Sequence, residues 1–112
     1  MAIKVDEYLT EEGKNPYKAW FDKLPVDYAV KVAAARARMM AGSLGNVKPL
    51  DGMLKEYRID WGSGIRIYLI QDGDKLIVLL GGGTKQGQKA DIKLAKTLRD
   101  EYSTRKAKLK KG

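Results

Sequence analysis

Charged side chains that could take part in chemistry gather in the second half of the sequence. Polar and apolar residues alternate along Leu54–Trp61, and in a strand this alternation places Glu56, Arg58 and Asp60 on one face. Arg66 lies in the next alternating segment, where one register adds it to this face and the other register turns it away. Two arginines on neighbouring strands present rigid guanidinium groups that can bind one phosphate through paired hydrogen bonds. If helices cover the opposite face of the sheet, this charged row is open to solvent.

Lysines extend the basic group. Lys85 and Lys89 follow the glycine run 81–83, near a predicted helix N-terminus whose free N–H groups favour anions. Lys48 lies in the loop that leads into the first strand of the predicted meander. The sequence therefore predicts a basic concavity that contains one carboxylate, Glu56. The alternative is an ordinary charged sheet face on which Glu56 pairs with one of the arginines.

The residue types that are missing exclude several kinds of site. The sequence has no cysteine, which excludes disulfides, thiolate metal sites and cysteine nucleophiles. It has no histidine, so no imidazole can act as an acid, a base or a metal ligand. Asp72 and Asp74 are turn residues and supply too few oxygen ligands for a cation. We expect neither a metal nor a cofactor.

Two features have a structural as well as a functional interpretation. Trp61 lies at a predicted hairpin tip, where it could stack on a nucleic-acid base or cover the turn as a core residue. The segment Gly81-Gly82-Gly83-Thr84-Lys85 differs from a nucleotide-binding loop, because the G-x-x-x-x-G-K-[ST] pattern is missing. The three glycines are predicted to allow a close backbone approach and to end the preceding strand.

Length and charge narrow the class of protein. The chain has 112 residues, which fits one domain spanning residues 1–112. It carries 22 Lys and Arg against 14 Asp and Glu, a formal charge of +8. This excess predicts a nucleic acid or an acidic protein as partner, or charge that serves solubility alone. No apolar run approaches the ~20 residues of a membrane span, and charge occurs within the first six residues. We therefore expect a cytoplasmic protein without membrane association.

Hydropathy patterning predicts an α+β domain with the order β-α-α-β-β-β-α, in which a helical pair packs on one face of a small, mainly antiparallel sheet. Asn15-Pro16 predicts a helix start, and Asp72-Gly73 predicts a tight hairpin. The second helix carries an apolar stripe formed by Val26, Val30, Ala33, Ala37 and Met40. The predicted elements are a strand in 1–7, a helical hairpin over 16–41, a loop over 45–52, strands over 54–61, 65–71 and 75–80, a helix over 88–102 and a flexible basic tail over 105–112.

The order of these residues resembles the RelE/ParE superfamily of toxins from type II toxin–antitoxin systems. The match is to its HigB-like branch, also called the phage Gp49-like or addiction-module killer proteins, and it covers nearly the whole chain. The pattern reads Lys48-Pro49-Leu50, Gly52-x-Leu54-x-Glu56-x-Arg58-Ile59, Gly64-Ile65-Arg66-Ile67-Tyr68 and Leu79-Leu80-Gly81-Gly82-x-x-Lys85-x-x-Gln88-x-x-Asp91-Ile92-x-x-Ala95.

The resemblance implies a RelE-like fold and a ribosome-dependent endoribonuclease, an mRNA interferase that inhibits translation. In this metal-free hydrolase chemistry the 2′-OH attacks the adjacent phosphate and leaves a 2′,3′-cyclic phosphate. The resemblance also implies a cognate antitoxin as partner, usually a helix-turn-helix protein, besides mRNA and the ribosome.

The resemblance also implies roles for individual residues. Arg58 and Arg66 would hold the scissile phosphate, and Lys85 would neutralise developing charge or protonate the leaving oxygen. Glu56 is the carboxylate placed to act as the base. The residues expected to contact RNA outside the reacting phosphate are Lys48, Lys89 and Trp61.

Two other functions fit the same pattern. A ParE-like toxin binds DNA gyrase and cleaves no RNA, and it shares the fold. Because a gyrase inhibitor needs no phosphate clamp, Arg58, Arg66 and Lys85 favour the ribonuclease. A non-catalytic, phage-derived binding module is the third possibility, and the lack of histidine keeps it open.

Overall fold

The computed structural model describes residues 2–111, with backbone only for residue 111. Its elements are β1 (Lys4–Glu7), α1 (Pro16–Asp22), α2 (Val26–Met40), β2 (Val47–Asp51), β3 (Leu54–Ile59), β4 (Ile65–Asp72), β5 (Leu76–Thr84), a short 3₁₀ helix η1 (Lys85–Gly87) and α3 (Gln88–Lys111). The predicted α+β class, the helical pair and the C-terminal helix are confirmed. As predicted, Asn15 caps α1, its side chain accepting a hydrogen bond from the Lys18 N–H, and proline follows at the first helical position.

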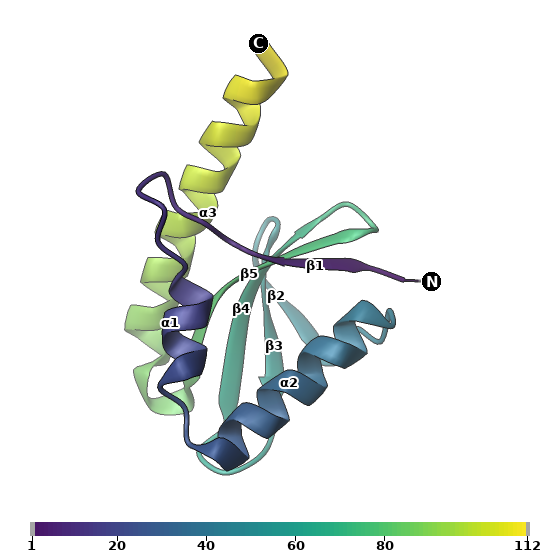
Figure 1. The fold of residues 1–112 in the computed structure, drawn as a ribbon, viewed down its shortest axis with the longest axis vertical. Helices are drawn as coiled ribbons and strands as arrows, with labels where there is room; N and C mark the ends of the chain where they lie inside the picture. Colours follow the sequence, from purple (N-terminus) through teal and green to yellow (C-terminus); the bar gives the residue numbers. More distant parts are fainter. Residues whose placement is uncertain (1, 112) are drawn as a thin grey trace.

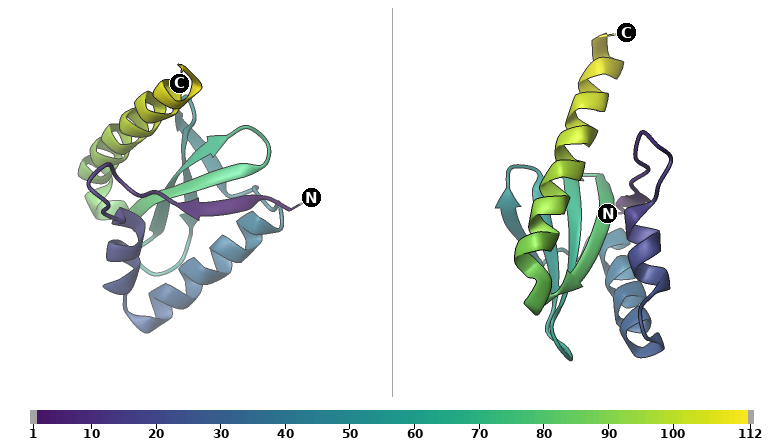
Figure 2. Two further views of the ribbon diagram at one scale, coloured as in Figure 1. Left: turned by 45° about the horizontal axis from the view of Figure 1, so that its top comes forward. Right: turned by 90° about the vertical axis from the view of Figure 1, so that its left-hand side faces the viewer.

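The five strands form one mixed sheet in the order β1-β5-β4-β3-β2. β1 is parallel to β5, and the other neighbours are antiparallel. Figures 1 and 2 show three layers, with α1 and α2 on one face of the sheet and α3 on the other. This arrangement matters for the site, because both faces of β3, β4 and β5 lie against helices.

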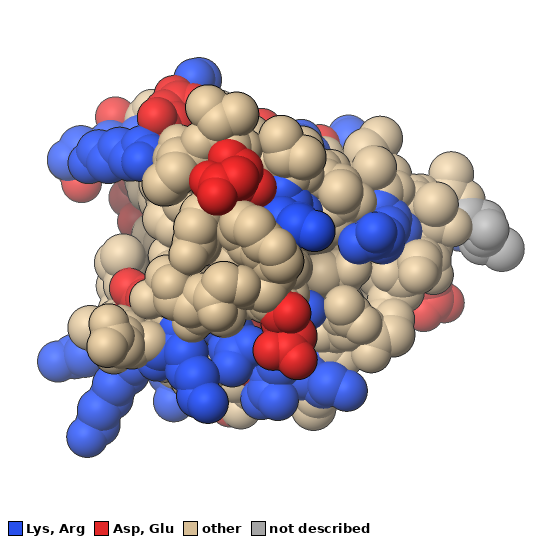
Figure 3. Space-filling view, turned by 90° about the horizontal axis from the view of Figure 1, so that it is seen from below, with Lys and Arg blue, Asp and Glu red and all other residues tan. Residues whose placement is uncertain are grey.

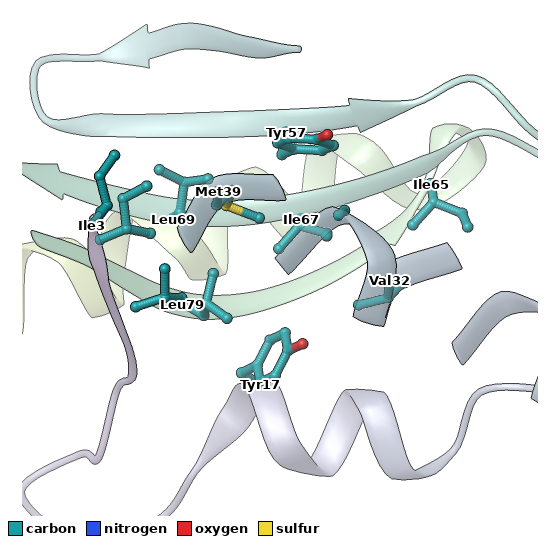
Figure 4. Packing of buried hydrophobic residues seen from close by; sticks show 12 residues of the cluster. Ile3, Tyr17, Val32, Met39, Tyr57, Ile65, Ile67, Leu69 and Leu79 are labelled. Atoms are coloured by element: carbon teal, nitrogen blue, oxygen red, sulfur yellow. The ribbon is translucent and has the colours of Figure 1, made fainter. Parts of the chain in front are cut away.

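Each face of the sheet has its own hydrophobic core. On the α1–α2 side, Tyr17, Val32 and Met39 from the helices pack on strand residues such as Tyr57 and Ile67 (Figure 4). On the α3 side, the buried residues are Tyr8, Leu54, Tyr68, Ile70, Val78, Leu80, Ala95 and Leu98. Alternation along β3 and β4 thus serves two cores, since odd and even residues point to opposite helical layers.

The apolar stripe that identified α2 lies on its outer side. Val26 is 81% exposed and Val30 61%, and Ala33, Ala37 and Met40 are exposed as well. The helix instead buries Val32, Ala35 and Met39. Both sets recur at helical spacing, so periodicity alone could not decide which one faces the sheet.

Two segments differ from the prediction because they gain a strand partner. The predicted loop over 45–52 contains β2, an edge strand that pairs with β3. β5 was predicted to end at the glycines, but it continues through them to Thr84. A Cβ atom at Gly82 would overlap the Trp20 ring of α1, and one at Gly83 would overlap the Asp91 carboxylate of α3. The glycines therefore allow the strand to pass between two helices, which confirms the predicted close approach.

The predicted flexible tail over 105–112 is wrong for the residues described there, since α3 continues to Lys111. Two tail residues hold this part of the helix to the strands. Arg105 Nη1 donates to the Leu9 carbonyl at 2.6 Å, and Lys106 Nζ pairs with Asp72 at 2.5 Å. The prediction of a solvated basic run was wrong because Arg105 and Lys106 have acceptors on distant segments.

None of the helices in the described part of the chain has the length and apolar character needed to cross a membrane.

Candidate functional site

The strand register brings the two predicted arginines together. Arg58 on β3 lies directly opposite Arg66 on β4, and Arg66 lies opposite Gly83 on β5. Directly opposed residues share one face, with Cβ atoms ~4.5–5.5 Å apart. This face is the one that α3 covers, because Tyr68 and Leu54, from the same alternating rows, belong to the α3 core. The site therefore lies at the junction of three strands and the start of α3.

The sequence predicted that Glu56 lies on an open face, but α3 covers it. Its side chain has no solvent exposure, and both oxygens have donors from the described residues. Oε2 accepts a hydrogen bond from Arg58 Nε, and Oε1 accepts one from Gln88 Nε2 at 3.0 Å. A buried carboxylate needs such partners, since an unpaired charge in the interior is costly. The pairing of Glu56 with Arg58 was the alternative that the sequence had left open.

Arg58 remains available to a ligand although it pairs with Glu56. Its side chain is 48% exposed, and its one hydrogen bond within residues 2–111 uses Nε. The two terminal nitrogens keep their donors, and these have the geometry for a bidentate phosphate contact.

Lysines surround the arginine pair. The Lys85 N–H donates to the Gly64 carbonyl at 3.1 Å, so Lys85 lies beside the start of β4, two positions along the strand from Arg66. Lys48 on β2 lies opposite Glu56, and Lys89 is in the first turn of α3. All three lysines are exposed. Seen from the end of the molecule that carries the β3–β4 turn, Lys and Arg side chains gather along one margin (Figure 3).

Behind the arginines, two polar atoms are buried without a hydrogen-bond partner among the described residues: Arg66 Nε and the Tyr68 hydroxyl. Tyr68 and Asp91 both line a cavity of about 30 Å³ under α3. Burial raises the pKa of Asp91. The floor of the site is thus polar but closed, and its open part is formed by arginine and lysine.

Burial, reinforced by the Glu56 and Asp91 carboxylates, raises the pKa of Tyr68 to about 12. An unfolded tyrosine ionises near pH ~10. The folded state therefore holds this proton more tightly, and the stability it contributes is present below pH ~10 and lost as pH rises toward ~12.

Between pH 9 and 11.5, we expect the ionisation of Tyr68 to lower the free energy of unfolding of the wild type by on the order of 2 kcal/mol. The free energy of unfolding of Tyr68→Phe should fall by less over the same range. Urea unfolding at the two pH values measures this difference. Tyr28→Phe, which removes a hydroxyl that bonds the exposed Ser63, is the control; equal losses in wild type and Tyr68→Phe would contradict the prediction.

Trp61 is not placed with the arginines. Its ring packs edge-on against Tyr28, at a centroid distance of 5.0 Å, and Lys31 Nζ lies 5.3 Å from its centroid. Both partners belong to α2, on the other side of the sheet. These contacts fit the interpretation of Trp61 as a residue that covers the turn.

Three residues of the site received no functional role from the sequence, although they belong to the pattern that carries the resemblance: Tyr68, Gln88 and Asp91. Tyr68 lies in the same alternating run as Arg66, so its side of the sheet could have been inferred. Gln88 and Asp91 lie in the first turn of α3, and nothing local indicates that this turn packs over Glu56. Within residues 2–111, no three acidic side chains lie close enough together to hold a metal ion.

Comparison with known proteins gives a relative for almost the entire chain. No protein-family model matches the chain. An uncharacterized protein of Haemophilus influenzae is 35% identical to it over 102 residues, which is 90% of this chain and 97% of that protein. Identity at this level over nearly the full length of both chains means a shared fold. The chain therefore belongs to the same family as this Haemophilus influenzae protein.

Proposed function

We propose that this chain is the toxin of a type II toxin–antitoxin system and acts as a ribosome-dependent mRNA endonuclease of the RelE/ParE superfamily, in its HigB-like branch. The observation that carries the proposal is the direct pairing of Arg58 with Arg66 on one face of the sheet, with Lys85 beside them. Like charges directly opposite each other destabilise a sheet, so the pair suits an anionic ligand, for which Arg58 keeps its two terminal nitrogens.

The reaction requires stabilised negative charge more than any other feature. The RNA 2′-OH gives its proton to solvent water and attacks the adjacent phosphorus, which forms a five-coordinate phosphorane. The 5′-oxygen then leaves and takes up a proton, and the product is a 2′,3′-cyclic phosphate. Arg58 and Arg66 hold the non-bridging oxygens, where charge accumulates. Lys85 neutralises the leaving oxygen or gives it a proton. Lys48 and Lys89, on either side, contact neighbouring phosphates of the RNA.

The expected partner is a cognate antitoxin, a small helix-turn-helix protein. A formal charge of +8 suits both ribosomal RNA and an acidic segment of such an antitoxin. The antitoxin neutralises the activity, so co-expression provides a control for toxicity.

Controlled expression of the chain in a bacterium tests the proposal, with growth, protein synthesis and mRNA 5′ ends followed together. Cuts phased with codons on ribosome-bound mRNA, absent with Arg58→Ala, are the expected result. Chromosomal DNA breaks with intact mRNA would instead indicate a ParE-like gyrase inhibitor. Normal growth with intact mRNA and DNA would indicate a non-catalytic binding module, and either of these results would overturn the ribonuclease proposal.

A further inference from the structure

Gln88 joins the start of α3 to the phosphate-binding arginines through a buried carboxylate. Its side-chain amide donates to Glu56 Oε1 at 3.0 Å, while Glu56 Oε2 accepts from Arg58 Nε. Glu56 is completely buried, whereas Arg58 is half-exposed. The chain of contacts therefore runs from a helix, through an inaccessible carboxylate, to a guanidinium group at the surface.

These contacts determine how Arg58 is presented. A hydrogen bond through Nε fixes the plane of the guanidinium group and leaves the two terminal nitrogens for a ligand. An exposed arginine without such a bond samples many rotamers, so binding a phosphate costs the conformational entropy of ordering its side chain. The bond from Gln88 in turn holds the Glu56 carboxylate in the orientation that Arg58 requires.

The same contacts argue against Glu56 as the proton acceptor. A general base must come within ~2.6–3.2 Å of the hydroxyl that it deprotonates. Glu56 has no exposed surface, and each of its oxygens already accepts a hydrogen bond. The substrate 2′-OH would have to displace Gln88, and with it the first turn of α3.

We propose that Gln88 and Glu56 are positioning residues that pre-organise Arg58 for a phosphate of the RNA backbone, and that Glu56 does not take up the 2′-OH proton. This inference rests on the proposed function. It extends that function by assigning the buried carboxylate to the binding of phosphate rather than to proton transfer.

The Arg58 Nε–H provides a readout that does not depend on RNA cleavage. In ¹H–¹⁵N spectra of the folded protein, with the Arg58 signal assigned by its loss in Arg58→Lys, we expect slow solvent exchange of this proton. Gln88→Ala should accelerate the exchange by about tenfold or more, since a free arginine side chain loses its protection. Gln86→Ala, which removes the same type of side chain from an exposed position two residues earlier, should leave it unchanged. Wild-type exchange in Gln88→Ala overturns the inference, whether or not the protein cleaves RNA.

Kinetics on ribosome-bound mRNA separate positioning from proton transfer. Gln88→Ala should raise KM about 3- to 10-fold with kcat nearly unchanged, as expected when ground-state and transition-state phosphate binding weaken together. Glu56→Gln retains an oxygen that can accept from Arg58 Nε, so we expect it to keep kcat within about tenfold and to keep the pH profile of the wild type. If Glu56→Gln lowers kcat by ~10²–10⁴-fold and the acidic limb of the pH profile disappears, Glu56 is the general base and the assignment is refuted. If the wild type cleaves no RNA, the proposed function fails, and the exchange experiment still decides the positioning.

Discussion

Replacing Arg66 with alanine is expected to lower RNA cleavage by ~10²–10³-fold, the usual cost of removing one preorganised donor from a developing oxyanion. Arg66 lies opposite Arg58 in the sheet register and opposite Gly83 of β5. Without Arg66, Arg58 alone supplies guanidinium charge to the phosphorane. We expect the loss to appear mainly in kcat, since the charge on the phosphorane exceeds that of the ground-state phosphate.

Single-turnover cleavage of ribosome-bound mRNA measures this effect. Arg66→Met keeps an aliphatic side chain of similar length and should be as inactive as Arg66→Ala while unfolding like the wild type. Arg38→Ala removes an exposed arginine from α2, on the opposite side of the sheet, and should be fully active. Activity of Arg66→Met within a few-fold of the wild type would mean that the arginine pair is not the phosphate site.

The second large effect is on stability. Gly82→Ala should destabilise the fold by about 3 kcal/mol, the upper end of the range for overpacking. The new Cβ would overlap the Trp20 ring and lie 2.7 Å from the Arg66 carbonyl oxygen. Relief requires a shift of α1 away from β5 or a break in the β4–β5 pairing, and either one removes buried contacts.

Urea unfolding followed by circular dichroism checks this value, and the thermal midpoint should fall by roughly 10 °C or more. Gly45→Ala is the matched control, because a Cβ atom at Gly45 meets nothing within 4 Å and its backbone does not require glycine. A Gly82→Ala variant as stable as Gly45→Ala would show that β5 does not pass closely between the helices.

Much of the central sheet was predictable because its signals are local. Alternation and the Asp72-Gly73 turn indicate β3, β4 and β5, whereas the register shift between Tyr68 and Leu69 in the β4–β5 pair was not predicted. β2 was missed because it is a short edge strand with a proline, and Pro49 is tolerated where one side of a strand has no partner. The course of β5 through its glycines depends on Trp20 and Asp91, which are distant in sequence.

The cationic residues of the site were predictable from the sequence, but the helix that covers this face of the sheet was not. Spacing alone placed Arg58 and Arg66 on neighbouring strands but left two registers open, and the observed register puts both residues on the same side. Nothing in the local sequence showed that α3 returns over that face, so Glu56 was predicted to be accessible and Gln88 was overlooked. Which face a terminal helix covers is decided by the complete core, here by Ala95 and Leu98 against Tyr68 and Leu80.

The parallel pairing of β1 with β5 has a consequence for synthesis of the chain. Lys4 pairs with Leu76 and Glu7 with Leu79, so β1 leaves the ribosome about 70 residues before its partner strand β5. At ~5–20 residues per second, that interval is roughly 4–15 s. The hairpins of β3, β4 and β5 close over short loops and can form earlier. Pairing of β1 with β5 closes a long loop and forms later. A nascent chain of this protein therefore cannot complete its sheet before β5 has left the ribosome.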